Sequence, residues 1–85
     1  MSGVDGGYFG SIEAARKVGI SLRQLYHWVD VLHVVEPVKF KHGIREFRRF
    51  SEQDVAVLAK MKEIVDLGYT LHAAVGILKK TREAA

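Results

Sequence analysis

The 85-residue sequence predicts a mainly α-helical domain of about four helices with a two-stranded β-hairpin. Apolar residues recur every three or four positions in four segments, the spacing of helices that bury one face. Between the second and third segments, residues 38–48 alternate between apolar and charged side chains, as paired strands do. A chain of this length that is 48% hydrophobic and 27% charged forms one globular domain. We assign residues 1–7 to a flexible lead and residues 8–85 to the domain.

The first helix is expected to begin at Ser11, whose side chain would cap it. Its buried face carries Ile12, Ala15 and Val18 at helical spacing. Gly19 follows the last apolar position, so we expect it to end the helix in the left-handed conformation that glycine adopts readily.

The second helix is assigned to residues 22–31. Ser21 precedes it, and Gln24 follows three residues later, which is the spacing of a capping box. Its buried face is expected to consist of Leu22, Leu25, Tyr26 and Val29. Trp28 lies beside that face, where it would either cover the core or pack against a sugar-phosphate; we favour the core.

Arg23, Gln24 and His27 fall on the opposite side of this helix. Only Gly19 and Ile20 join it to the first helix, and such a short connection indicates a helix-turn-helix. Arginine suits guanine and glutamine suits adenine in the major groove of DNA. The alternative is that these residues serve only solubility, as on most surface helices.

The hairpin is assigned to residues 38–48, after Pro37 interrupts the helical pattern, with its turn at His42-Gly43. The alternation predicts one basic face formed by Lys39, Lys41, Arg45 and Arg48. Arg49 is turned away from that face. The aromatic side chains expected to pack inward are Phe40, Phe47 and Phe50.

A cationic hairpin beside a helix-turn-helix is a wing, so the predicted fold is a winged helix-turn-helix. Two strands alone are marginally stable in water, and the hairpin must therefore pack against the helices. The alternative is an edge hairpin whose lysines merely discourage aggregation.

Ser51 is expected to cap the third helix, which ends at Leu67-Gly68, and Thr70 to cap the fourth. The third helix buries Val55, Leu58, Met61 and Ile64. The fourth contains Leu71, Ala74, Val75, Ile77 and Leu78. Three valines of these helices are predicted to be exposed, where another helix or a protein partner could pack on them: Val57, Val65 and Val75.

The positive charge of the chain is concentrated in one region. The formal net charge is +3, but residues 16–49 hold eight Lys or Arg against three acidic residues. A local basic surface suits a polyanion such as nucleic acid.

Other functional classes lack their sequence signals. The chain has no cysteine, and its histidines (27, 33, 42 and 72) are scattered without ligand spacing, so we expect no metal or cofactor. We find no acid pair, activated nucleophile or glycine-rich phosphate loop, and we expect no enzyme activity. Neither a membrane span nor a signal peptide is apparent, which makes the cytoplasm, in association with the nucleoid, the expected location.

Several stretches spread over residues 9–78 together resemble the MerR family of transcriptional regulators. Phe47-Arg48-Arg49-Phe50-Ser51 is similar to the family's aromatic-Arg-x-aromatic-Ser at the end of the wing. Val18-Gly19-Ile20-Ser21 matches its helix-turn-helix, and Leu67-Gly68-Tyr69-Thr70-Leu71 matches the end of its third helix and the loop into the fourth. Two departures stand out: Tyr26-His27-Trp28-Val29 replaces Arg-Tyr-Tyr-Glu, and Leu32-His33 replaces a frequent glycine.

The resemblance implies sequence-specific binding of double-stranded DNA, with helix 22–31 in the major groove and hairpin 38–48 on flanking phosphates. The residues it assigns to base edges are Arg23, Gln24 and His27. Those it assigns to phosphates are Ser21, Lys39, Lys41, Arg45, Arg48 and Arg49. Contact with about five phosphates would give a log–log salt slope near −4 to −5.

Family members dimerise through a long helix after the fourth one, and the resemblance also implies RNA polymerase at the promoter as a partner. Only seven residues follow Leu78, so we expect a monomer that dimerises on DNA or through a C-terminal helix absent from this chain. Two alternatives remain: an excisionase-like or chromosome-organising architectural protein of the same fold, and a protein-interaction module.

Overall fold

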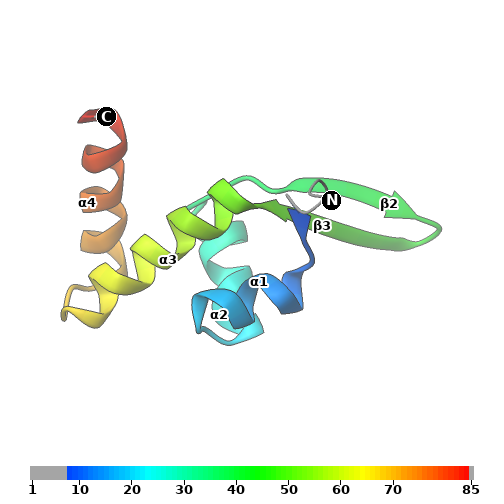
Figure 1. Cartoon of the computed structure of the whole chain (residues 1–85), viewed down its shortest axis with the longest axis horizontal. Coiled ribbons are helices and arrows are strands. Elements are labelled where there is room, and N and C mark those ends of the chain that lie inside the picture. Colours follow the sequence, from blue (N-terminus) through cyan, green and yellow to red (C-terminus); the bar gives the residue numbers. More distant parts are fainter. Residues whose placement is uncertain (1–7, 85) are drawn as a thin grey trace.

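The computed structural model describes residues 8–84, so the lead predicted for residues 1–7 lies outside the described residues. The elements are β1 (Tyr8–Phe9), α1 (Ser11–Val18), α2 (Leu22–Tyr26), η2 (His27–Val31), β2 (Val38–His42), β3 (Arg45–Ser51), α3 (Glu52–Asp66) and α4 (Leu71–Ala84). In Figure 1 the strands β2 and β3 project from the helices as a long arm, and α4 stands at the opposite end. The predicted winged helix-turn-helix, mainly α with a β-hairpin wing, is confirmed.

The first helix starts differently from the prediction. Gly10, not Ser11, is the N-terminal cap; it has extended backbone and no side-chain cap bond, and Ser11 is already helical. The chain enters α1 directly from β1, which leaves no extended residue after Gly10. Ile12 is 66% exposed, so its predicted burial was wrong; Ala14 takes its place in the core.

Gly19 ends α1 as predicted. Its φ of 88° lies in the left-handed region, and its N–H donates to the carbonyl of Ala15 at 2.8 Å. This turn delivers the chain to Ser21, which forms the predicted capping box with Gln24. The helix-turn-helix geometry is therefore built from two local backbone signals.

The second helix covers the predicted range, but its last turn is wider than an α-turn. In η2 the helix is of the π type, and the N–H of Leu32 donates to the carbonyl of His27, five residues back, at 3.1 Å. His33 then adopts a φ of 54°, and the N–H of Val34 donates to the carbonyl of Trp28 at 2.9 Å. A histidine thus occupies the left-handed position at which many helices have glycine.

One core joins the helices to the base of the wing. Its largest fully buried side chains are Trp28, Phe50, Leu25, Leu58 and Met61. The favoured placement of Trp28 in the core is confirmed, because the side chain is only 2% exposed. Val34 and Val35, in the segment after η2, are also buried. This segment therefore seals the core before the chain reaches β2.

The hairpin forms with a register that pairs Phe40 with Phe47 and His42 with Arg45. The turn is therefore Gly43-Ile44, one residue later than predicted. Gly43 has a φ of 68°, which suits the first central position of a type II′ turn. At the base of the hairpin, β1 adds a third antiparallel strand beside β3, so the sheet order is β1-β3-β2.

The third and fourth helices follow the predicted signals. Ser51 and Asp54 form a capping box at the start of α3, and Gly68, with a φ of 110°, follows its end. Thr70 caps α4 by accepting a hydrogen bond from the N–H of Ala73 at 3.1 Å. The valines predicted to be exposed are instead half-buried against the core: Val57, Val65 and Val75. No helix in the described range 8–84 is long and apolar enough to cross a membrane.

Candidate nucleic-acid interface

The exposed side of the second helix carries the residues predicted to contact bases. Arg23, Gln24 and His27 are all exposed, while Leu25 on the other side is fully buried. Because α2 and η2 run on from one another, these side chains share one surface of the second helix. This surface is called the reading face below: Arg23, Gln24 and His27.

The capping box limits what Gln24 can offer. Its Oε1 accepts a hydrogen bond from the Ser21 N–H, and its own N–H donates to Ser21 Oγ, both at 3.0 Å. The Nε2 amide group of Gln24 remains a donor, and the Ser21 hydroxyl proton can still be donated. Two-bond recognition of adenine by Gln24 would require its Oε1 to accept from the base as well.

The basic side chains of the wing lie on both of its faces, so the prediction of one basic face was wrong. Side chains that pair across the hairpin point to the same side, and the register pairs Lys39 with Arg48 but His42 with Arg45. Arg45 therefore shares its face with Arg49, opposite Lys39 and Arg48. The prediction overlooked that Arg45 and Arg48 lie three positions apart on one strand, so they face opposite sides whichever two residues form the turn.

The outward face of the wing is aromatic as well as basic. Phe40 and Phe47 were predicted to pack inward, but they are 38% and 39% exposed and stack on each other, with centroids 5.4 Å apart. The Arg49 guanidinium carbon lies 5.1 Å from the centre of the Phe40 ring. Only Phe50, at the base of the hairpin, reaches the core, because the outer part of the wing extends beyond the helices.

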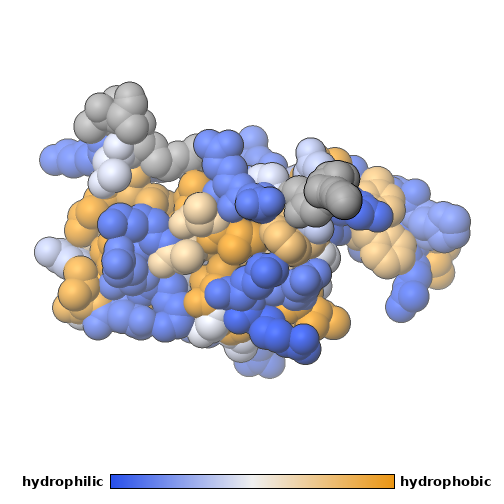
Figure 2. Space-filling model, in the orientation of Figure 1, coloured by the Kyte–Doolittle hydropathy of each residue, from blue (hydrophilic) through white to orange (hydrophobic). Residues whose placement is uncertain are grey.

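The hydropathy surface shows the same mixture. In Figure 2 most of the visible surface is hydrophilic, but hydrophobic side chains are exposed along the arm formed by the wing. The most exposed apolar side chain is Ile44, in the turn at the wing tip.

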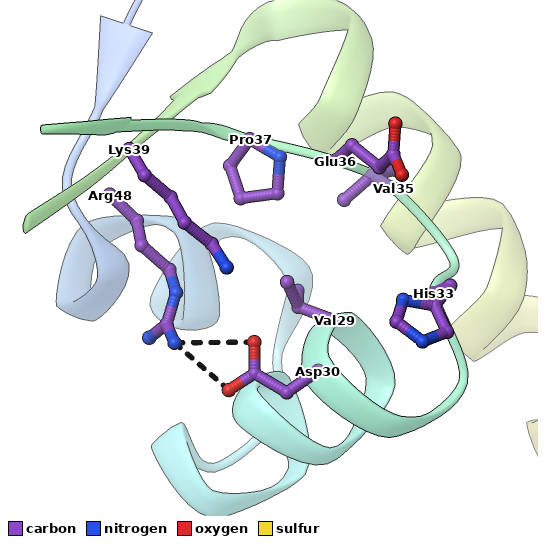
Figure 3. Close-up of a pocket in the computed structure, with 8 residues that line it drawn as sticks. All are labelled: Val29, Asp30, His33, Val35, Glu36, Pro37, Lys39 and Arg48. Atoms are coloured by element: carbon purple, nitrogen blue, oxygen red, sulfur yellow. Dashed lines mark hydrogen bonds and ion pairs between the residues drawn. The ribbon is translucent and has the colours of Figure 1, made fainter.

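Arg48 is turned toward the second helix rather than toward solvent. Its Nη2 donates to both carboxylate oxygens of Asp30, at 2.9 and 3.2 Å, as Figure 3 shows. Its guanidinium carbon lies 4.8 Å from the centre of the Tyr26 ring. The wing is thus fastened to the helix that carries the reading face.

A pocket of about 430 Å³ opens between η2 and the start of the wing. It is lined by Val29, Asp30, His33, Val35, Glu36, Pro37, Lys39 and Arg48. Figure 3 shows Lys39 from β2 and Arg48 from β3 reaching into the same space above Asp30. Within residues 8–84, the histidines and acidic residues form no group of three or more that could hold a metal ion.

Two contributors to this site were missed at the level of sequence. Asp30 was counted only as one of the few acidic residues of the basic region, and Tyr26 only as a core residue. Their contacts with Arg48 join β3 to the second helix, and no local sequence pattern encodes such contacts. The Arg48–Asp30 separation of 18 residues places the contact beyond the reach of helix or hairpin periodicity.

Comparison with known proteins agrees with this architecture. Residues 11–81 match the family described as MerR HTH family regulatory protein. An HTH-type transcriptional regulator of Mycobacterium tuberculosis is 35% identical over 66 residues, which cover 78% of this chain and 29% of that protein. One from Mycobacterium bovis aligns to the same extent, and one from Synechocystis is 32% identical over 66 residues, 46% of its length. The chain therefore spans less than half the length of these relatives. It belongs to the MerR HTH family of transcriptional regulators.

Proposed function

We propose that this domain binds double-stranded DNA sequence-specifically, with helix 22–31 in the major groove and the wing on the flanking phosphates. The observation that carries the proposal is the joint placement of the two elements. The second helix exposes an arginine, a glutamine amide and an imidazole, and the same helix contacts the projecting cationic hairpin through Asp30 and Arg48. The Arg48–Asp30 ion pair holds the two together before any DNA is present.

Arg23 is the proposed principal reader of a base. It is exposed, it lies in the first turn of α2, and no hydrogen bond within residues 8–84 occupies its guanidinium. An arginine in this position can donate two hydrogen bonds to O6 and N7 of guanine. Gln24 and His27 would add contacts from the same face, Gln24 through its Nε2.

The phosphate contacts are proposed for the exposed polar groups around this face. Lys39 and Lys41 approach from the inner face of the wing, and Arg45 and Arg49 from its outer face. Ser21 would donate its hydroxyl proton to a phosphate at the start of the second helix. A hairpin with cations on both faces can sit along a groove edge and touch the strands on either side.

Regulation would require a second copy of the domain, because one domain reads only one half-site. A dimer places its two recognition helices one helical turn apart, so its operator would be an inverted repeat. In the longer relatives, the region outside the matched part is where we place dimerisation, effector binding and contact with RNA polymerase.

The test is a selection of bound sequences from a random duplex pool, repeated with the Arg23→Ala variant. The wild-type domain should enrich a short motif, and the variant should lose the preference for guanine at one position. On the wild-type motif, loss of a two-bond guanine contact should raise the Kd about five- to 150-fold.

Lys80→Ala is the matched control. This exposed cation lies on α4, at the end of the molecule opposite the wing, so its removal should change neither the motif nor the Kd by more than about twofold. Enrichment of the same motif by wild type and Arg23→Ala would show that the second helix does not read the sequence. Enrichment of no motif by the wild type would contradict sequence-specific binding.

A further inference from the structure

The ion pair between Arg48 and Asp30 differs from the other ion pairs of the described residues. The pairs Lys60–Glu63 and Lys62–Asp66 lie within one helix, α3, and join neighbouring turns. Arg48 and Asp30 instead connect β3 to η2. An ion pair within one helix stabilises that helix, whereas the Arg48–Asp30 pair restrains the position of β3 relative to η2.

Arg48 is held from several sides. Its side chain is only 17% exposed, its guanidinium lies against the Tyr26 ring, and one nitrogen donates to both oxygens of Asp30. Its Nε is buried and has no hydrogen-bond partner within residues 8–84. A phosphate could bind Nη2 only by displacing Asp30, so the nitrogen of the ion pair is not available to DNA while the pair is formed.

Lys39 is the cation next to it that remains free. It pairs with Arg48 across the hairpin, lines the same pocket and forms no ion pair with any described residue. The inner face of the wing therefore contains an arginine committed to the protein and a lysine open to an anion. Both residues were predicted from the sequence to contact phosphates, but in this geometry only Lys39 is free to do so, while Arg48 binds Asp30.

Asp30 itself needs an explanation in a DNA interface. A carboxylate beside the reading face repels phosphates, so it lowers affinity unless it serves another purpose. It is 38% exposed at its side chain and forms its only ion pair within the described residues with Arg48.

We propose that Asp30 and Arg48 are positioning residues: together they pin the wing to the recognition helix, and Arg48 supports DNA binding through that pin rather than through a phosphate. The proposal rests on the proposed function. It predicts that removing either side chain makes the position of the wing relative to the second helix more variable. The domain then binds DNA more weakly, although no phosphate contact has been removed.

The first test measures the pin without DNA. The chain contains no cysteine, so spin labels can be placed at Val31→Cys on η2 and at Ile44→Cys in the wing turn, both exposed. Pulsed electron paramagnetic resonance should give a narrow distance distribution in the parent, a broader one in Asp30→Ala, and an intermediate one in Asp30→Asn. Distance distributions of equal width in all three proteins would show that the Asp30–Arg48 pair does not hold the wing in place, whether or not the domain binds DNA.

The second test is a double-mutant cycle on one duplex, with Kd measured over a range of salt concentrations. Asp30→Ala and Arg48→Met should each weaken binding about three- to thirtyfold, and the double variant should be no weaker than either single one. Neither should change the log–log salt slope, whereas Lys39→Ala should reduce its magnitude by about 0.9.

The control for charge alone is Glu36→Gln, which removes an exposed carboxylate that lines the same pocket but forms no ion pair in the described part of the chain. It should leave binding unchanged or slightly tighter. If Asp30→Ala bound DNA more tightly and with a steeper log–log salt slope, Arg48 would have moved from Asp30 to a phosphate. If Arg48→Met reduced the magnitude of that slope, Arg48 would already contact a phosphate in the parent. Either result would overturn the proposal while leaving DNA binding itself intact.

Discussion

Replacing His33 with glycine should stabilise the domain. His33 has a φ of 54°, is exposed, and forms no side-chain hydrogen bond with any residue in the range 8–84. An L-residue in the left-handed region costs about 1–2 kcal/mol, which glycine avoids. Glycine in turn loses about 0.5–1 kcal/mol through the greater freedom of its unfolded chain. The midpoints of these two ranges differ by about 0.75 kcal/mol, which is the expected net gain in the free energy of unfolding.

For a domain of this size, such a gain raises Tm by about 2–8 °C. Circular dichroism at 222 nm during heating measures it directly. Glu36→Gly, three residues further on and without a positive φ, should instead lose about 0.4–1 kcal/mol through unfolded-chain entropy. If His33→Gly lowered Tm as much as Glu36→Gly does, the backbone at the end of the second helix would not be left-handed as described.

Three further substitutions test the fold and the wing. Leu58→Ala removes a fully buried side chain from α3 and should lower the free energy of unfolding by about 2–5 kcal/mol in urea denaturation; a loss below about 1 kcal/mol would argue against its core position. Ser21→Ala breaks a capping box and should lose about 1 kcal/mol, whereas Ser11→Ala, which removes no cap, should change stability by no more than a few tenths. Phe47→Thr disrupts the stack with Phe40 and should lose about 0.5–1.5 kcal/mol while the salt slope of DNA binding stays the same; a changed slope would show that this face holds phosphate-binding cations in place.

The helices could be predicted well because their signals are local. Gly19 and the capping boxes at Ser21 and Ser51 determine where helices begin and end through contacts three or four residues apart. The buried face of α3 follows from apolar periodicity, which places Leu58 and Met61 on one side. Such features need no knowledge of the rest of the fold.

The errors arose where the answer depends on other elements. His42-Gly43 and Gly43-Ile44 are both acceptable two-residue turns, and the wrong one of the two was predicted. The inward packing predicted for Phe40 failed because the wing extends past the helices that would have covered it. Apolar alternation shows that a face is distinct, but only the arrangement of the helices decides whether that face is buried.

In the candidate site, too, the local features could be predicted from the sequence and the tertiary ones could not. Exposure of Arg23 and His27 followed from their opposition to the buried Leu25, a local relation. The ion pair of Arg48 with Asp30 joins β3 to η2, two elements distant in the sequence, and is a tertiary relation. Among the basic residues, sequence alone could not separate those that face solvent from the one that fastens the protein together.

The most direct test of the account maps both elements on one duplex. An iron–EDTA cleavage reagent attached to Val31→Cys on the recognition helix, or to Ile44→Cys in the wing turn, should cut DNA at fixed positions within about one helical turn of each other. Cleavage by both probes in that register is the predicted result. Cleavage from only one position, or from both without a fixed spacing, would contradict the claim that helix and wing hold the same stretch of DNA.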